Sequence, residues 1–273
     1  MYHLGLRPGD LPETVLVPGD PDRASAIASA WDSSEALAEH REFRSFRGTY
    51  RGARIGVVSA GIGGPSMAIV VEELARLGVR TIVRVGSCGT LRPEIRAGDL
   101  VISTAAARFE GASRAYAPPG YPAVADPEVV RALAESAREE GVRFHLGITA
   151  TVDTFYLEQG RPGWRGYFPP HLGDPLHELR ALGCLNLEME CATLLTIAGV
   201  YGLRAGAVCT VFGDLEDGTP VPADVAPSLR VANEAVCRLR ASRGASTGSR
   251  RSAGGAATVG DVRRRAGPRR GLK

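Results

Sequence analysis

Two glutamates stand one residue apart in the stretch NLEMEC, directly before a run that is almost wholly apolar. Glutamates are rarely fully buried unless they are paired, so Glu188 and Glu190 are candidate functional groups. On a strand the two side chains would share one face about 6–7 Å apart, and on a helix they would not face each other. A glycosidase pair must flank the scissile bond, whereas neighbours on one strand face approach it from the same side.

A second candidate group is an arginine inside an apolar run, Arg84 in TIVRVGSCG. A charge there must be paired or must bind an anion. Ser87 follows it with hydroxyl and backbone donors, and the turn VPGDPDR places Gly19 and Arg23 where a strand passes into a helix, a common anion site. With Arg41 in HREF, these residues indicate a phosphate pocket, while a structural ion pair is the alternative for Arg84.

The stretch DTFYLEQGRPGW combines an aromatic side chain with an amide and a guanidinium, in Phe155, Gln159 and Arg161. A planar heterocycle needs this combination, because its ring stacks on an aromatic face and its edge meets donors and acceptors. An exposed loop with aromatic anchors is the structural alternative.

Other kinds of site are not expected. AGIGGP, residues 60–65, lacks the GxGxxG spacing of a dinucleotide site. The five cysteines are odd in number and have no CxxC spacing, which predicts buried core thiols in a reducing cytoplasm and no metal site. No apolar window approaches 20 residues, and the first residues lack the basic and apolar regions of a secretory signal. We therefore expect a cytoplasmic protein away from membranes.

Strands and helices alternate along the chain. Apolar, β-branched runs predict strands at residues 15–17, 55–59, 81–85, 100–103, 147–152 and 205–212. Helical patterns occupy residues 63–78, 126–141 and 223–240, with Asp126 as an N-cap and Gly78 as a terminator. The sequence therefore predicts a single α/β domain with a mixed, mostly parallel central sheet flanked by helices.

The charge changes sharply after residue 240. Residues 241–273 carry nine basic residues and one acid, a net charge of +8, so residues 1–240 carry −5 of the overall +3. The first segment is the predicted catalytic domain, and the second is a Gly-, Ser-, Ala- and Arg-rich tail expected to be disordered. Basic tails can bind nucleic acid, but the acidic domain argues against that role here, and we expect catalysis to survive removal of the tail.

Several motifs together carry a family resemblance. YHLGL, VPGDPDR, HREF, GIGGPS, EELARLGVRTIVRVGSCG, FEGASRAYAPPGYPAVAD, DTFY and LEMECATLL resemble, in order and spacing, the bacterial uridine phosphorylases across residues 2–212. The resemblance implies a nucleoside phosphorylase-like fold assembled as a homohexamer, a trimer of dimers. It also implies a pentosyltransferase of pyrimidine nucleoside salvage that converts uridine and phosphate to uracil and ribose 1-phosphate, with no cofactor beyond the co-substrate phosphate.

The resemblance also implies roles for individual residues. Arg84, Glu190 and Arg161 would be the catalytic groups. Phosphate would be held by Gly19, Arg23, Arg84 and Ser87, with Arg41 of a neighbouring subunit. Ribose would be held by Met189 and Glu190 and by the neighbour's His3, while Glu188 is either a second ribose contact or a structural partner. The base would be bound by Phe155, Gln159 and Arg161, and a monovalent cation by Glu42, Ile62 and Ser66.

One departure from the family pattern keeps alternatives open. Where relatives carry an Asn-Arg pair near the base loop, this chain has Asp214 and Leu215, and Phe212 stands in a wall that is normally aliphatic. Asp214 leaves open the alternative of a purine or broad-specificity phosphorylase, although Gln159 and Arg161 favour uridine. A nucleoside hydrolase would replace phosphate by water and should not need three arginines.

Overall fold

The fold is built from strands and helices that alternate along most of the chain. The computed structural model describes residues 1–214 and 223–251. The strands are β1 (Thr14–Pro18), β2 (Ser33–His40), β3 (Phe43–Tyr50), β4 (Ala53–Val58), β5 (Thr81–Thr90), β6 (Leu100–Arg108), β7 (Ala123–Val124), β8 (Phe144–Thr151), β9 (Asn186–Glu188) and β10 (Arg204–Asp214).

The α-helices are α1 (Pro21–Ser29), α2 (Gly64–Arg76), α3 (Pro127–Glu139), α4 (Pro175–Ala181), α5 (Cys191–Tyr201) and α6 (Ala226–Arg251). Short 3-10 helices are η1 (Ala112–Ala115), η2 (Leu157–Gln159), η3 (Trp164–Gly166) and η4 (Pro170–Leu172).

The sheet is mixed, and part of it closes on itself. Its strands follow the order β10-β6-β8-β9-β5-β1-β4-β3-β2, and β10 pairs with β5 as well. Strands β5, β9, β8, β6 and β10 therefore form a ring, while β1 to β4 extend from it as an open sheet. Ring closure satisfies edge hydrogen bonds that an open sheet would leave exposed.

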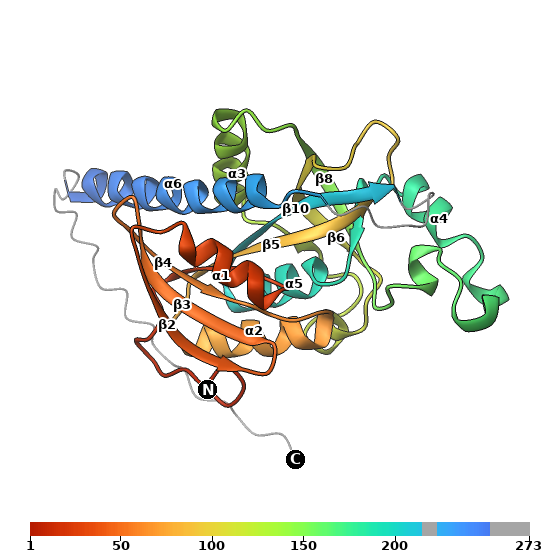
Figure 1. The fold of residues 1–273 in the computed structure, drawn as a ribbon, viewed down its shortest axis with the longest axis horizontal. Helices are drawn as coiled ribbons and strands as arrows, with labels where there is room; N and C mark the ends of the chain where they lie inside the picture. Colours follow the sequence, from red (N-terminus) through yellow and green to blue (C-terminus); the bar gives the residue numbers. More distant parts are fainter. Residues whose placement is uncertain (215–222, 252–273) are drawn as a thin grey trace, which may run out of the picture. The chain divides into compact units, whose positions relative to one another are not determined.

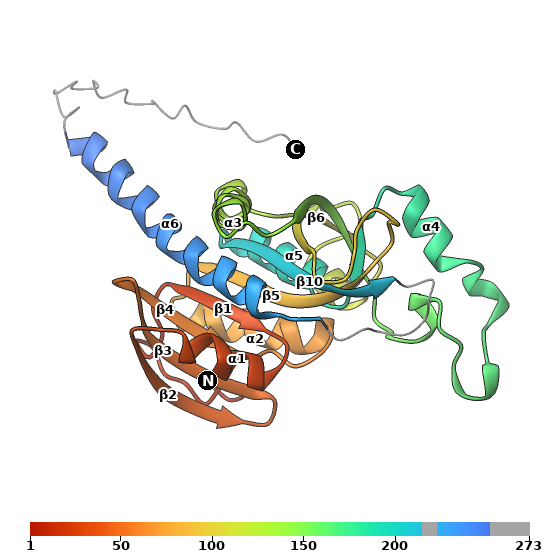
Figure 2. The same ribbon diagram turned by 45° about the horizontal axis from the view of Figure 1, so that its top comes forward.

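Helices cover both faces of this sheet (Figure 1, Figure 2). Helices α2 and α5 pack on one face and α1, α3 and the described part of α6 on the other. Successive residues of β1 show why: Val15 and Val17 face the first layer and Leu16 the second. A strand buried on both faces reads as an unbroken apolar run, as this one does.

The structure confirms the predicted α/β class and mixed sheet. Each of the six predicted strand runs overlaps a strand, and the three helical patterns correspond to α2, α3 and α6. Asp126 caps α3 by accepting from the backbone N–H groups of Glu128 and Val129, as predicted. The hairpin β2–β3 was not predicted, because residues 33–40 are largely exposed and carry no continuous apolar run.

The chain divides into two compact units, Met1–Arg240 and Ala241–Lys273. Helix α6 continues to Arg251. The domain boundary at residue 240 and the disorder expected of residues 241–273 stay predictions. Residues 252–273 lie outside the described range. Within the described residues, no helix is both long and apolar enough to span a membrane.

Candidate active site

A cavity of about 710 Å³ opens at the carboxyl ends of β1, β5 and β10, the place where α/β sheets commonly bind ligands. It brings together segments that lie far apart in the sequence. It is lined by Gly19, Asp20, Pro21, Arg23, Glu42, Gly61, Ile62, Arg84, Gly86, Ser87, Cys88, Gly89, Phe155, Gln159, Arg161, Leu187, Glu188, Met189, Glu190, Phe212 and Gly213.

The cavity reaches β5 at a gap between two of its partner strands. Strand β1 pairs with β5 as far as Val85, and β9 pairs with it only from Gly89, while β10 occupies the other edge. The intervening residues of β5, from Gly86 to Cys88, therefore present backbone and side chains to the cavity. A Cβ atom on Gly86 would lie 2.9 Å from Nη2 of Arg84, so glycine here leaves room for the guanidinium.

Two glycine turns form the wall nearest to this gap. The loop after β1 and the loop after β4 run side by side, since Gly61 donates its N–H to the carbonyl of Gly19 at 2.9 Å. A Cβ atom on Gly19 would stand 3.0 Å from the carbonyl oxygen of Gly61, which explains the glycine. Asp20 then caps α1 by accepting from Asp22 N–H, so the positive end of this helix faces the cavity.

Arg23 and Arg84 bring two positive charges to the same wall. Arg23 donates to the carbonyl of Val85 at 3.2 Å. Burial lowers the pKa of Arg23, and the neighbouring Arg84 cation lowers it further. Two close cations beside backbone N–H groups and the Ser87 hydroxyl form a suitable site for a small multivalent anion.

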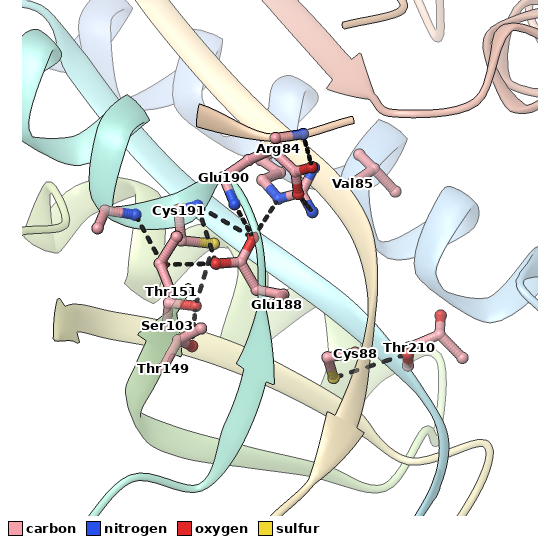
Figure 3. A network of polar contacts seen from close by, with 12 residues as sticks. Arg84, Val85, Cys88, Ser103, Thr149, Thr151, Glu188, Glu190, Cys191 and Thr210 are labelled. Carbon is pink, nitrogen blue, oxygen red and sulfur yellow. Dashed lines mark hydrogen bonds and ion pairs between the residues drawn. The ribbon is translucent and has the colours of Figure 1, made fainter. Parts of the chain in front are cut away.

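Arg84 is the centre of a buried ion-pair network (Figure 3). Its Nε donates to Glu188 at 3.0 Å and its Nη2 to Glu190. Burial alone would lower the pKa of Arg84, but the two carboxylates raise it well above its ordinary value. Among the described residues its buried Nη1 has no hydrogen-bond partner, so the protein leaves the donors on this nitrogen unused. Arg84 can therefore form a structural ion pair and bind an anion at the same time, so the two interpretations from the sequence do not exclude each other.

Glu190 joins three elements at the cavity wall. It is the N-cap residue of α5, and its carboxylate accepts from Arg84 and from the N–H of Gly63 at the start of α2. A carboxylate offers about four acceptor positions, so two of them are still open on Glu190. Paired hydroxyl donors of a sugar would match those positions. Met189 lies beside it, half-buried, and lines the same wall.

Glu188 lies deeper and has more partners. It ends β9, and its carboxylate accepts from Arg84, from Thr151 at 2.6 Å and from the N–H groups of Glu190 and Cys191. Burial raises the pKa of Glu188 to about 7, although the Arg84 cation opposes this. Thr151 was not identified from the sequence, because a threonine at a strand end carries no distinctive pattern.

A different set of residues lines the end of the cavity near η2. Arg161 donates to the carbonyl of Phe155 at 2.9 Å and to Oε1 of Gln159 at 2.8 Å. The guanidinium carbon of Arg161 lies 4.4 Å from the centre of the Phe155 ring. The segment that carries η2 and α4 lies beyond the carboxyl end of β10 in both ribbon views (Figure 1, Figure 2). The predicted aromatic, amide and guanidinium combination is therefore assembled at one place.

Strand β10 contributes Phe212 and Gly213 to the cavity wall. The register with β5 shifts between Val211 and Asp214, and Gly213 has a φ of 146°, a value suited to glycine. Leu215 lies outside the described residues, and the side chain of Asp214 is not described.

His3 and Arg41 do not line the cavity of their own chain. They lie in one region of the surface, where His40 hydrogen-bonds to the carbonyl of His3 at 2.9 Å. Arg41 is exposed and has a left-handed backbone with a φ of 56°. His3 contacts Glu73 at 2.9 Å. Their assignment to a neighbouring subunit's site remains a prediction.

The three residues considered for a monovalent cation are only partly associated with the cavity. Glu42 and Ile62 line it. Ser66 donates to the carbonyl of Ala60 and is 3.5 Å from the Glu42 carboxylate.

All five cysteines are free; four of them are buried, which confirms the prediction of core thiols for those four, and Cys237 is half-buried. Cys191 and Cys209 lie close enough to Arg84 to interact with its charge, and Cys88 contacts Cys209. Hydrogen bonds from Cys191 and Cys88 hold the pKa of Cys209 well below its usual range, and the Arg84 cation lowers it further. Sequence patterns did not reveal this cluster of three thiols, because its members come from β5, α5 and β10.

Comparison with known proteins assigns the class. Residues 13–242 match the model of the phosphorylase superfamily, and the chain belongs to this family. It is 51% identical over 86% of its length to the uridine phosphorylase of Thermococcus kodakarensis, covering 85% of that protein. It is 47% identical over 77% of its length to the uridine phosphorylase of Escherichia coli, again covering 85%. It is 38% identical over 81% of its length to the guanosine phosphorylase of Halorubrum lacusprofundi, covering 87%.

Proposed function

We propose that this protein cleaves uridine with inorganic phosphate and releases uracil and ribose 1-phosphate. The observation that carries the proposal is the position of Arg84. Its Nη2 holds Glu190, the candidate ribose ligand, and its Nη1 has no hydrogen-bond partner among the described residues, while Gly19, Arg23 and Ser87 line the same cavity as Arg84. One buried side chain thus connects an anion site to a sugar site within a single cavity. The relatives named uridine phosphorylase, at 51% and 47% identity, support uridine as the substrate.

The chemistry follows from this arrangement. As the bond between C1′ and the base nitrogen breaks, its electron pair passes to the uracil ring and positive charge develops on the ribosyl group. A phosphate held beneath C1′ offsets that charge, and one of its oxygens then forms the new bond to C1′. Holding two reactants in line can lower the barrier by about 7–11 kcal/mol. The Arg161 and Gln159 side chains would stabilise the negative charge that develops on the leaving base.

An assay of base release tests this proposal. The dialysed, chelator-treated protein is incubated with uridine, with and without inorganic phosphate, and uracil and ribose 1-phosphate are quantified. We expect release only with phosphate and no requirement for a cofactor. Equal release without phosphate would overturn phosphorolysis and favour a nucleoside hydrolase. A requirement for an added metal or organic cofactor would overturn the prediction that phosphate is the sole co-substrate.

A purine nucleoside is the second candidate substrate. The guanosine phosphorylase relative supports it, and Phe212 stands in the cavity wall, where a change of bulk would alter the preference between bases. Under the same conditions inosine and guanosine are compared with uridine by kcat/KM. A higher value for either purine nucleoside would replace the uridine assignment.

We also propose that the site is completed by a second copy of this chain in a homohexamer, a trimer of dimers. The support is that His3 and Arg41 lie together on the surface and apart from their own cavity. Two inactive variants, Arg41→Ala and Arg84→Ala, are mixed under subunit-exchanging conditions, with each variant alone as the control. Since a mixed dimer contains one site with both native arginines, activity should return. No recovery despite verified exchange, or a monomer in light scattering, would overturn shared sites.

A role in pyrimidine nucleoside salvage in the cytoplasm fits these assignments. The support is the set of five free cysteines, since a reducing compartment keeps thiols from pairing. Cell fractionation with an antibody to the chain tests the location, and accumulation of uridine after gene deletion tests the role. Recovery of the protein outside the cytoplasmic fraction, or unchanged uridine levels, would contradict them.

A further inference from the structure

Glu188 and Glu190 differ in how many of their acceptor positions the protein already uses. The Oε2 atom of Glu188 accepts from Arg84 Nε at 3.0 Å, from Glu190 N at 2.8 Å and from Cys191 N at 3.0 Å. Its Oε1 atom accepts from Thr151 Oγ1 at 2.6 Å and from Cys191 N at 2.9 Å. Among the described residues, Glu190 by contrast accepts from only two donors.

This difference limits what Glu188 can do. A carboxylate has about four acceptor positions, and four separate groups of the protein already donate to Glu188. Its side chain is also 3% exposed. A ribose hydroxyl could bond to Glu188 only by displacing a protein donor, and that donor would then be buried without a partner. Direct contact with the sugar is therefore disfavoured.

We propose that Glu188 is a positioning residue that aligns the phosphate-binding Arg84 with the ribose-binding Glu190 and does not itself contact substrate. This inference rests on the proposed phosphorolysis. Its geometric basis is that one carboxylate holds the guanidinium of Arg84 through Nε and the backbone of Glu190 through its N–H (Figure 3). Glu188 would therefore set the positions of both binding groups, Arg84 for the phosphate and Glu190 for the ribose.

Thr151, which donates to Glu188, is itself held by a further hydrogen bond. Thr151 Oγ1 donates to Glu188 and accepts from the N–H of Ala192 at 2.9 Å, so the end of β8 and the first turn of α5 fix the carboxylate. The N–H of Cys191 adds a third tie to the same helix terminus. Bond formation at C1′ is sensitive to small displacements, and an error of about 1 Å can cost about 100-fold in rate. Loss of Glu188 should therefore appear mainly in kcat.

The ionisation of Glu188 provides an independent readout. The charged or titratable groups around it are Arg84, Glu190 and the thiols of Cys88, Cys191 and Cys209. Its pKa is raised to about 7 by burial. A proton on Glu188 would replace an acceptor by a donor, although Arg84 and the N–H groups of Glu190 and Cys191 can only donate, so alignment should weaken as pH falls through about 7. The ratio of wild-type to variant kcat isolates this effect, because the titration of phosphate is common to both proteins.

The deciding experiment combines enzyme variants with a substrate that lacks a hydroxyl. Full-length wild type, Glu188→Gln and Glu190→Gln are assayed with uridine, 2′-deoxyuridine and 3′-deoxyuridine at saturating phosphate. For Glu188→Gln we expect kcat to fall about 100-fold with all three substrates. For Glu190→Gln, the sugar ligand, the loss should shrink when a contacted hydroxyl is absent. Glu35→Gln, which removes an exposed carboxylate paired with Arg47, is the control for the charge change.

The outcomes separate the possibilities. A Glu188→Gln defect that disappears with either deoxynucleoside would overturn the inference and make Glu188 a ribose contact. A wild-type to Glu188→Gln kcat ratio that is constant from pH 5 to 9 would also contradict it. No uracil release by the wild type would instead show that the proposed function has failed, and the inference would fall with it.

A second pair of variants decides the matter if Glu188→Gln does not fold. Thr151→Val removes one donor to Glu188 and keeps its charge, whereas Thr151→Ser keeps the hydroxyl. We expect kcat to fall about tenfold in Thr151→Val with all three nucleosides and to recover in Thr151→Ser. Equal activity of the two variants would overturn the positioning role.

Discussion

The two ends of the cavity are built from different kinds of structure. At the phosphate and ribose end, Arg84, Glu188 and Glu190 are 3%, 3% and 5% exposed, and they are fixed by β5, β9 and the first turns of α2 and α5. At the other end, Phe155 is 42% exposed and Arg161 packs on its ring in the segment around the short helix η2.

The difference indicates a division of labour. Groups proposed to hold the phosphate and sugar are buried among partners and cannot shift without disturbing the core. Of the groups proposed to bind the base, Gln159 is buried, whereas Phe155 and Arg161 are more exposed on a connecting segment, where substitutions cost little stability. Substitutions at the buried end should therefore affect both folding and catalysis, and those at the other end mainly the choice of base.

The largest effect is expected for Arg84→Ala. It removes the phosphate donor and leaves Glu188 and Glu190 buried without their cation, which costs about 3–5 kcal/mol in similar pairs. We expect kcat/KM for phosphate to fall about 1000-fold and the free energy of unfolding to decrease. Steady-state kinetics and urea unfolding measure the two effects. Arg84→Lys, which retains charge without the fork, should recover only part of either; normal phosphate use in Arg84→Ala would contradict the assignment.

The next effect is expected for Glu190→Ala. The variant should fold, because the carboxylate lies at the cavity wall, but kcat/KM for uridine should fall about 100-fold as the sugar loses its acceptor. Circular dichroism checks the fold and uracil release checks the rate. A folded variant with near-normal kinetics would exclude Glu190 as the ribose ligand.

A smaller and more selective effect is expected for Arg161→Ala. Loss of a charged donor to the base should lower kcat/KM for uridine about tenfold, while the KM for phosphate and the unfolding free energy change little. Varying each substrate in turn measures this separation. An equal rise in the KM for phosphate would mean that the two ends do not act independently.

Phe212→Leu should change the preference between bases more than the rate itself. A smaller side chain in the wall enlarges the space beside the base, and a change in pocket volume typically alters discrimination about tenfold. The ratio of kcat/KM for uridine to that for inosine is the measurement. An unchanged ratio would remove Phe212 from the determinants of specificity.

The smallest effect is a pH dependence of stability at the buried end. The folded pKa of Glu188 is raised to about 7, above its unfolded value near 4.3, so its contribution to stability is present below about pH 4 and is lost as pH rises through 7. The Tm of wild type relative to Glu188→Gln should thus be higher at pH 5 than at pH 8. A difference of the opposite sign, measured by scanning calorimetry, would contradict the raised pKa.

Local sequence patterns predicted a large part of this arrangement. The apolar runs indicated the strands, and Gly19, Asp20 and Pro21 indicated a turn into a helix, because the residue types themselves favour these conformations. The burial of Arg84 within β5 also followed from its neighbours. Residue types grouped Phe155, Gln159 and Arg161 as a possible site for a planar heterocycle, and the family resemblance assigned that site to the base.

The pair of glutamates shows where such patterns stop. Neither a continuous strand nor a continuous helix describes NLEMEC, since Glu188 ends β9 and Glu190 caps α5. Their roles depend on donors from Arg84, Thr151 and Gly63, which are remote in sequence. Spacing alone could not assign one carboxylate to support and the other to the cavity wall.

The sequence by itself determined the alternation of strands and helices, the glycine turns and the presence of a charge that had to be paired, because these depend on local conformational preference and burial. Only the tertiary structure decided that β10 closes a ring with β5, that Cys88 and Cys191 meet at Cys209, and that Glu188 is surrounded by donors while Glu190 keeps acceptor positions open. These features depend on contacts between distant segments, and the number of donors that reach each carboxylate is fixed only when those segments pack.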